Sequence, residues 1–451
     1  MARKRTPNTA LARCIRSADI TYEALARAVN AVGAEVGLDL RYDRTSIAHW
    51  LGGARPRGPV PELLAEALAR RLHRPVAPAE IGLAEADDTA PQSHTDTVAA
   101  ILDLGRADMD IDRRTLLRHT VYSLAAVAAI PAWAEIAERS ARAVGATTPR
   151  IGTGEVDAVR TMAEAFSGID DQFGGGHARS SVAAYIAGDL TRWLRADAPV
   201  AVRADLYSAA ADLLYLAGFM AWDDAAHGLA QRYYLRAVDL AAQAEDAATY
   251  ATVLRGMSLQ ANSLGHHLHG LHLAEAAVSA VGTSAPPRMR AFLLGQQAVS
   301  LAAVGERQAA VRTLSTAERH LEAASSSPSS TFGGYHPAAL AFQEAHLRAH
   351  LGDVAGAAAA MKTSTRRRPA MERRSRAMAT AHLAEYQYRA GHLEASCATW
   401  NTFLDDYPHL VAGRADAAFK RARNQAQRHR TNTAARALSH RLAGMRTRPW
   451  E

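Results

Sequence analysis

The chain has 451 residues, which is too long for one ordinary core and favours two or three domains. Alanine makes up over a fifth of the residues and aromatic residues only 6%. Because alanine loses no side-chain entropy in a helix, this composition predicts an all-α protein and excludes β-sandwiches and Rossmann sheets. The two cysteines, Cys14 and Cys397, exclude a disulfide framework and cysteine-based zinc sites, and they fit a cytoplasmic location.

The formal net charge of +7 is distributed unevenly along the chain. Residues 1–83 hold 13 Lys and Arg against eight Asp and Glu, which is five of the seven excess charges. A small basic module on a near-neutral body suggests a polyanionic partner, most simply double-stranded DNA. The alternative is a solvated basic surface, and charge alone does not choose between them.

One segment is similar to an export signal. Arg113 and Arg114 precede the apolar run 121–133, as in a twin-arginine leader. However, more than 100 residues come first, and the run is shorter than a membrane span of roughly 20 residues. Residues 1–20 also lack an apolar stretch long enough for a signal peptide. We therefore expect no membrane partner, and we expect residues 116–130 to form a buried helix that connects two domains.

The first 83 residues carry a series of helix-start signals. Asn8, Thr21 and Asp43 each stand where an N-cap belongs, ahead of helices expected to reach Ser17, Val32 and Leu51. Gly33 and Gly37 are expected to loosen the chain after the second helix. An amphipathic helix over 62–72 and a short fifth helix over 78–83 are expected to follow.

Two of these segments resemble a known DNA-binding motif. Residues 21–26 (TYEALA) resemble the first helix of the Xre/Cro-type helix-turn-helix, and residues 43–56 (DRTSIAHWLGGARP) resemble its recognition helix and following turn. The connection over 32–42 is longer than the usual tight turn. Most of the chain resembles actinobacterial transcriptional regulators with tetratricopeptide-like C-terminal halves. That resemblance implies control of development or secondary metabolism, and relatives of similar architecture bind signalling peptides.

The expected recognition helix supplies the candidate DNA contacts. Arg44 suits the O6 and N7 atoms of guanine, and side chains from the first two turns of such a helix reach bases or phosphates. Flanking arginines suit phosphates. Ile47, Trp50 and Leu51 are assigned to the core, with Trp50 expected against Leu25, Val29 and Leu64. The candidate DNA-binding residues are Arg41, Tyr42, Arg44, Thr45, Ser46, His49, Arg55 and Arg57.

From about residue 200 to 410 the chain repeats. Gly265, Gly305, Gly352 and Gly391 each separate two apolar stretches, and a frame placed at Ala225 extends the series with steps of 40, 40, 47 and 39 residues. Small residues recur five positions after each frame start, because paired helices must approach closely. The pattern resembles tetratricopeptide repeats; generic alanine-rich hairpins are the alternative. Residues 410–445 are expected to form a terminal capping hairpin with a basic face.

These signals together predict a fold class and its domains. We expect an all-α chain with an N-terminal helix-turn-helix domain over 1–83 and a C-terminal α-solenoid of tetratricopeptide-like helix hairpins over 136–451. Residues 84–135 are expected to be a linker with a connecting helix, and its acidic, polar part over 84–110 reads as a hinge. The solenoid is expected to form a homodimer and to offer a groove for a peptide or small-molecule signal. The candidate groove residues are His177, Arg179, Tyr215, Phe219, Trp222, Gln260, Gln297, His346 and Tyr388.

No segment supports catalysis or a cofactor. The glycine run 174–176 lacks the Gly-Lys-Ser/Thr ending of a phosphate loop and reads as a break between helices. The cluster His266, His267, His269 and His272 has no Cys or carboxylate at ligand spacing. The pair Asp170–Asp171 is interpreted as helix capping. We therefore expect no enzyme, no cofactor and no metal. The two hypotheses are a DNA-binding transcriptional regulator and a protein-binding scaffold with a non-functional DNA-binding module.

Overall fold

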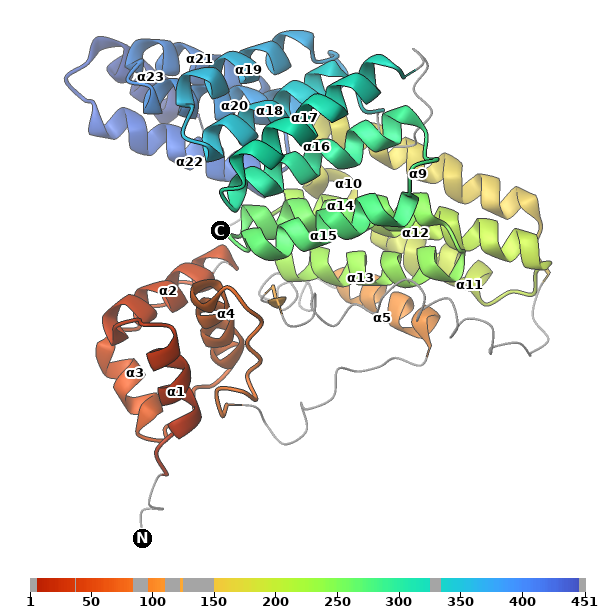
Figure 1. Ribbon diagram of the computed structural model, residues 1–451, viewed down its shortest axis with the longest axis horizontal. Helices are drawn as coiled ribbons and strands as arrows, with labels where there is room; N and C mark the ends of the chain where they lie inside the picture. The colour runs from red at the N-terminus through yellow and green to blue at the C-terminus, as the bar shows by residue number, and fades with distance from the viewer. Residues whose placement is uncertain are drawn as a thin grey trace. The chain divides into compact units, whose positions relative to one another are not determined.

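The structure is a computed structural model that describes residues 6–36, 38–83, 96–109, 122–124, 150–324 and 334–445. Over these residues the chain is all-α: helices account for the regular structure, and the one β-type pairing is an isolated bridge between Arg150 and Asp197 (Figure 1). No helix in the described ranges is long and apolar enough to cross a membrane. Gly37, most of the expected connecting helix over 116–130 and the loop 325–333 lie outside the described residues.

The first three helices of the N-terminal domain begin where the sequence predicts, and the next begins at Val60, two residues before the predicted start. The side chains of Asn8 and Thr21 accept hydrogen bonds from the backbone N–H groups of Leu11 and Ala24, which satisfies otherwise unpaired donors in the first turn of each helix. The helices are α1 (Thr9–Ser17), α2 (Tyr22–Glu35), α3 (Arg44–Leu51) and α4 (Val60–Leu72).

Two expectations for this domain are wrong. Gly33 does not loosen the chain but lies buried inside α2, where a Cβ atom would come within 2.5 Å of the Leu40 side chain. The segment that follows α2 therefore folds back closely onto the helix at Gly33. Residues 78–83 form hydrogen-bonded turns instead of a fifth helix. Those turns bury Ile81, whose carbonyl accepts a hydrogen bond from the Asn8 side chain at 2.9 Å.

The described chain divides into two compact units. The first holds the N-terminal domain together with α5 (Thr97–Met109), η1 (Ile186–Leu190), α11 (Thr191–Leu194), α12 (Val200–Asp223) and α13 (His227–Gln243). Helix α5 corrects the expectation of a hinge over 84–110. It packs on η1 and α13, and its buried Asp108 accepts a hydrogen bond from the Tyr233 hydroxyl at 3.0 Å.

The second unit is built from successive helix hairpins and contains residues 157–179, 247–262 and 269–451. Neighbouring hairpins stack through α16 on α18, α19 on α20 and α20 on α22, which makes this region an α-solenoid. The unit also holds most of α9 (Thr153–Phe173) and the start of α10 (Gly175–Tyr185). The hairpin helices are α14 (Ala247–Ser263), α15 (His267–Val281), α16 (Pro287–Ala303), α17 (Arg307–Glu322), α18 (Pro337–His350), α19 (Val354–Arg367), α20 (Arg373–Arg389), α21 (Leu393–Asp406), α22 (Gly413–Arg428) and α23 (Thr433–Gly444); the short η2 (Tyr407–His409) precedes α22.

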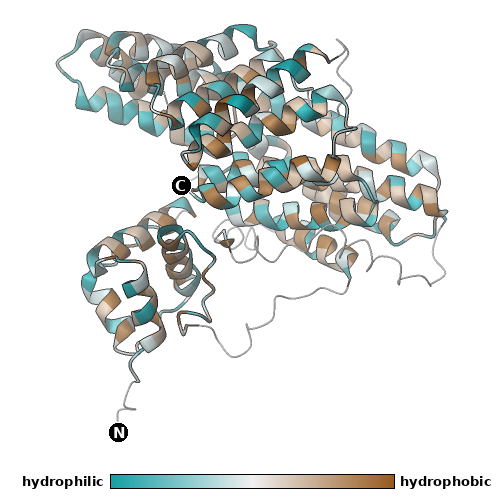
Figure 2. Ribbon diagram, viewed as in Figure 1, coloured by the Kyte–Doolittle hydropathy of each residue, from teal (hydrophilic) through white to brown (hydrophobic). Residues whose placement is uncertain are grey.

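The repeat frame is confirmed in the turns and in the packing. Gly265, Gly305, Gly352 and Gly391 all lie between the two helices of a hairpin with φ between 84° and 93°, a conformation that favours glycine. The small residues five positions later are buried where the paired helices meet: Ala230, Gly270, Ala310, Ala357 and Ser396. Figure 2 shows the result as hydrophobic and hydrophilic bands along the helices.

Candidate nucleic-acid interface and repeat surface

Helix α3 is the candidate recognition helix, and its start is held by a reciprocal cap. The Asp43 carboxylate accepts hydrogen bonds from the Ser46 backbone N–H at 2.9 Å and from its hydroxyl at 3.0 Å. These bonds lower the pKa of Asp43, so the cap is present at neutral pH. Ser46, predicted as a DNA contact, is thus half-buried and its hydroxyl is used in the cap.

The remaining side chains of α3 divide into an outer and an inner face. Arg44, Thr45 and His49 are exposed. Ile47 and Trp50 are buried, as expected, whereas Leu51 is only half-buried because it lies at the last position of the helix. The three exposed residues can therefore reach a partner while the buried pair anchors the helix.

The connection between α2 and α3 is pinned by a residue that the sequence analysis missed. The Asn30 side chain on α2 donates to the Tyr42 carbonyl at 2.8 Å and accepts from the Tyr42 backbone N–H at 2.9 Å. The Tyr42 ring, predicted to contact DNA, packs edge-on against Trp50 with the ring centres 5.0 Å apart. Asn30 is one of several polar residues of α2, so the sequence alone did not single it out.

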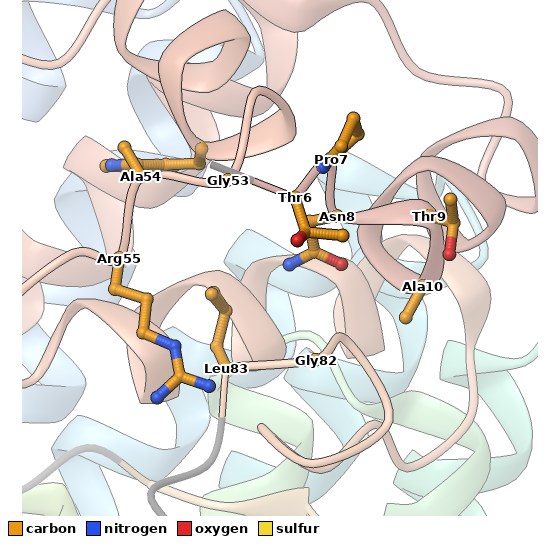
Figure 3. A pocket seen from close by; sticks show the side chains of 11 residues that line it. Thr6, Pro7, Asn8, Thr9, Ala10, Gly53, Ala54, Arg55, Gly82 and Leu83 are labelled. Atoms are coloured by element: carbon orange, nitrogen blue, oxygen red, sulfur yellow. The ribbon is translucent and has the colours of Figure 1, made fainter. Parts of the chain in front are cut away.

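The predicted phosphate-binding arginines are all exposed. Arg41 pairs with Asp39 at 3.1 Å, and both side chains are at least 80% exposed, so the pair contributes little stability. Arg55 lines a hollow of about 370 Å³ beside the N-terminus of α1. Figure 3 shows its guanidinium group beside Leu83, with Asn8 and Thr9 across the hollow. Gly53 closes this hollow with φ +90°, and a Cβ atom there would lie 2.2 Å from the Thr6 carbonyl oxygen.

Helix α4 is buried on more faces than the amphipathic helix that the sequence predicts. It also contacts His266, which lies in the turn between α14 and α15 and belongs to the first unit. Glu66, 3% exposed, binds Arg70 at 3.0 Å and the His266 ring. Tyr122 stacks on His266 with the ring centres 5.4 Å apart. Arg70 also holds both carboxylate oxygens of Glu35, at the end of α2, at 2.6 and 2.7 Å. A continuous polar network therefore joins the N-terminal domain to the turn before α15.

The Tyr122 segment is itself anchored by a buried glutamine. The Gln231 side chain on α13 accepts from the Ser123 backbone N–H at 2.9 Å and donates to the Ser123 carbonyl at 2.7 Å. Burial raises the pKa of Tyr122, so its hydroxyl stays protonated. His266 of the histidine cluster therefore does contact a carboxylate, that of Glu66, which lies 200 positions away in the sequence. In the described ranges, no three His, Cys, Asp or Glu side chains converge as a metal site requires.

Several candidate groove residues do not line an open surface. Tyr215, Trp222, Gln260 and Arg179 are buried at 5% exposure or less, because the alanine-rich helices approach closely enough to enclose them. Those that keep exposed surface are His177, Phe219, Gln297, His346 and Tyr388.

Two of these partly exposed residues, His346 and Tyr388, link neighbouring hairpins. The Tyr386 hydroxyl lies 3.1 Å from His346 Nδ1, and the Tyr388 hydroxyl lies 2.9 Å from His429 Nε2. Burial lowers the pKa of His346 well below its usual value and that of the adjacent His382 to about 3. Both imidazoles are therefore neutral at physiological pH.

The glycine run 174–176 separates α9 from α10, as expected, and it also docks on the solenoid. The Phe173 carbonyl accepts from the Val411 N–H at 2.6 Å, and the Gly176 N–H donates to the Val411 carbonyl at 2.8 Å. The preceding acids are not helix caps. Asp170 and Asp171 bind the buried Arg374 of α20 at 3.0 and 3.1 Å. The end of α9 therefore occupies part of the surface of the repeat region.

One protein-family model matches the N-terminal domain. Residues 11–84 match the family model described as SP15 N-terminal domain, a range that holds most of α1 and all of α2, α3 and α4. No curated protein sequence matches the chain. A chain in the crystal structure of the APC/C hetero-tetramer Cut9–Hcn1 aligns with a TM-score of 0.31 and 12% identity, over 96% of this chain and 74% of that chain. The solenoid assignment rests on the hairpins themselves.

Proposed function

We propose that the protein is a sequence-specific DNA-binding transcriptional regulator, with α3 as its recognition helix and the repeats as a sensor. The observation that carries the proposal is the capped helix α3, which exposes Arg44, Thr45 and His49 while Ile47 and Trp50 anchor it. Arg44 suits guanine in the major groove, and Arg41, Arg55 and Arg57 suit phosphates. The resemblance to Xre/Cro-type regulators supports the same assignment and the proposed control of development or secondary metabolism.

The polar network on α4 supports a sensing role for the repeats. A change at the turn before α15 would reach Glu66 through His266, and then Glu35 through Arg70. Glu35 ends the helix that precedes the recognition segment. The free thiols of Cys14 and Cys397 favour a reducing compartment such as the cytoplasm. The proposal assigns the chain no catalytic step and no cofactor.

A second candidate function is a protein-binding scaffold, favoured by the solenoid itself, because stacked helical repeats offer extended surfaces to protein partners. The two functions differ in what α3 does. A scaffold with a non-functional N-terminal module binds its partner equally well when the exposed face of α3 is changed.

Arg44→Ala is expected to weaken operator binding by about 1–3 kcal/mol, roughly 5- to 150-fold, because the variant cannot make a bidentate hydrogen bond to a base. DNA recovered with the protein from cells supplies the operator, and fluorescence anisotropy measures the affinity. Arg16→Ala, which removes an exposed arginine from α1, is the matched control and is expected to change affinity much less. Operator affinity within twofold of the native value for Arg44→Ala would contradict the proposal for α3.

We also expect the full-length protein to be a homodimer, because two joined DNA readers gain affinity from paired half-sites. Light scattering after size-exclusion chromatography measures the mass against 48.2 kDa for one chain. A mass that stays at one chain at high micromolar concentration, with and without operator DNA, would rule out the dimer.

A further inference from the structure

The terminal hairpin has a formal net charge of +7, more than the +5 of residues 1–83. Residues 413–445 contain a single acid, Asp416, and outside them 44 Lys and Arg balance 44 Asp and Glu. The eight basic residues of this hairpin are Arg414, Lys420, Arg421, Arg423, Arg428, Arg430, Arg436 and Arg441. Asp416 already accepts a hydrogen bond from the Tyr407 hydroxyl at 2.8 Å. The hairpin is therefore a strongly basic element at the end of the solenoid.

Two cations of the hairpin form ion pairs at short distance with carboxylates of α20 and α21. Arg421 binds Glu385 and Arg441 binds Asp405, each at 2.6 Å. In contrast, Lys420, Arg423 and Arg428 are exposed, and no carboxylate of the described chain lies within ion-pair distance of them. The guanidinium of Arg423 lies over the Phe419 ring at 6.0 Å, and all three charges remain exposed to an external partner.

The three free cations share one face of α22. Residues 420, 424 and 427 are spaced i, i+4, i+7, and Arg423 and Arg428 flank that line. Asn424 and Gln427 are exposed as well and add neutral hydrogen-bond donors. From 420 to 428 the face extends about 12 Å along the helix. Figure 2 shows hydrophilic residues along the visible side of α22.

The opposite face of α22 is packed into the core and holds the exposed stripe of three cations and two amides in a fixed position. Phe419, Ala422 and Ala426 are buried in the core cluster that also contains Trp400 and Phe403. Trp400 donates to the buried Gln425 of α22 at 2.9 Å. A rigid surface loses little conformational entropy when it binds.

The chemistry of this face distinguishes between polyanions. A helix that lies on a membrane must insert apolar side chains, but those of α22 are buried in the core and the exposed face carries amides and cations. Duplex DNA presents one negative charge about every 1.7 Å, so a stripe of about 12 Å meets several phosphates. We propose that the exposed face of α22 is a second DNA-binding surface, which contacts the phosphate backbone without reading sequence and acts independently of α3.

The test compares two triple variants of the full-length protein. Lys420→Gln, Arg423→Gln and Arg428→Gln together remove the stripe, and Lys362→Gln, Arg366→Gln and Arg367→Gln remove three equally exposed charges from α19. Anisotropy with a random-sequence duplex at several salt concentrations gives the slope of log affinity against log salt. We expect the α22 variant to reduce the steepness of that slope by about 0.9 for each phosphate that it no longer neutralises, and the α19 control to leave it nearly unchanged.

Equal slopes for the native protein and the α22 variant, or equal changes in the two variants, would overturn the proposal. So would an α22 variant that loses binding to vesicles of phosphatidylserine and phosphatidylcholine while its DNA binding is unchanged. Thermal unfolding checks that both variants stay folded. The Arg44→Ala measurement on operator DNA remains separate, so failure of α3 as a reader and failure of α22 as a backbone-binding surface give different results.

Discussion

Trp50→Ala is expected to unfold the N-terminal domain while the repeat region stays folded. Trp50 is 6% exposed, and replacing a buried aromatic residue with alanine costs about 3–5 kcal/mol. That is a large part of the stability of a domain of this size. Tyr42 also loses the ring against which it packs, so the start of α3 loses support on one side. Hydrogen–deuterium exchange followed by mass spectrometry is expected to show reduced protection over residues 9–72.

Tyr22→Ala provides the matched control, since Tyr22 is an aromatic residue of the same domain that is 45% exposed. We expect it to leave the exchange pattern nearly unchanged. A Trp50→Ala protein with native protection over α1 to α4 would show that the indole is not essential to the core.

Arg374→Ala is expected to destabilise the second unit by about 3–5 kcal/mol, because it removes the buried guanidinium that binds the buried carboxylate of Asp170. The Arg374 and Asp170 side chains are only 7% and 3% exposed. Burial already raises the pKa of Asp171, while Arg374 opposes that rise, so removal of the arginine should also favour protonation of this acid. Chemical denaturation of the full-length protein measures the change in unfolding free energy.

Limited proteolysis provides a second measurement on the same variant. Loss of Arg374 should loosen the end of α9 and expose the glycine run 174–176 to cleavage. Arg373→Ala is the neighbouring control, because Arg373 is 35% exposed and lies 3.8 Å from Asp406. If both variants unfold at the same denaturant concentration as the native protein, the buried pair does not hold α9 in place.

The local features of this protein were predictable because each depends on residues close together in the sequence. A side-chain oxygen at Asn8, Thr21 or Asp43 caps the helix that starts at the next residue. A glycine between two helical stretches, followed by a small residue five positions later, marks four of the hairpins, and each of these glycines has a positive φ. The all-α fold, the repeat frame and the exposed face of α3 follow from such signals.

Tertiary structure alone decided which polar residues are exposed and which are buried against a partner. Glu66 and His266 are 200 positions apart, and Asp170 and Arg374 are 204 apart, so no local pattern could pair them. The sequence predicts that Gly33 loosens the chain, whereas in the structure it lies within α2 and Leu40 folds back onto it. The sequence predicts Tyr215 and Trp222 as groove residues, whereas in the structure the neighbouring helices enclose both. In each case the contact forms only when elements distant along the chain pack together, so the local sequence does not reveal it.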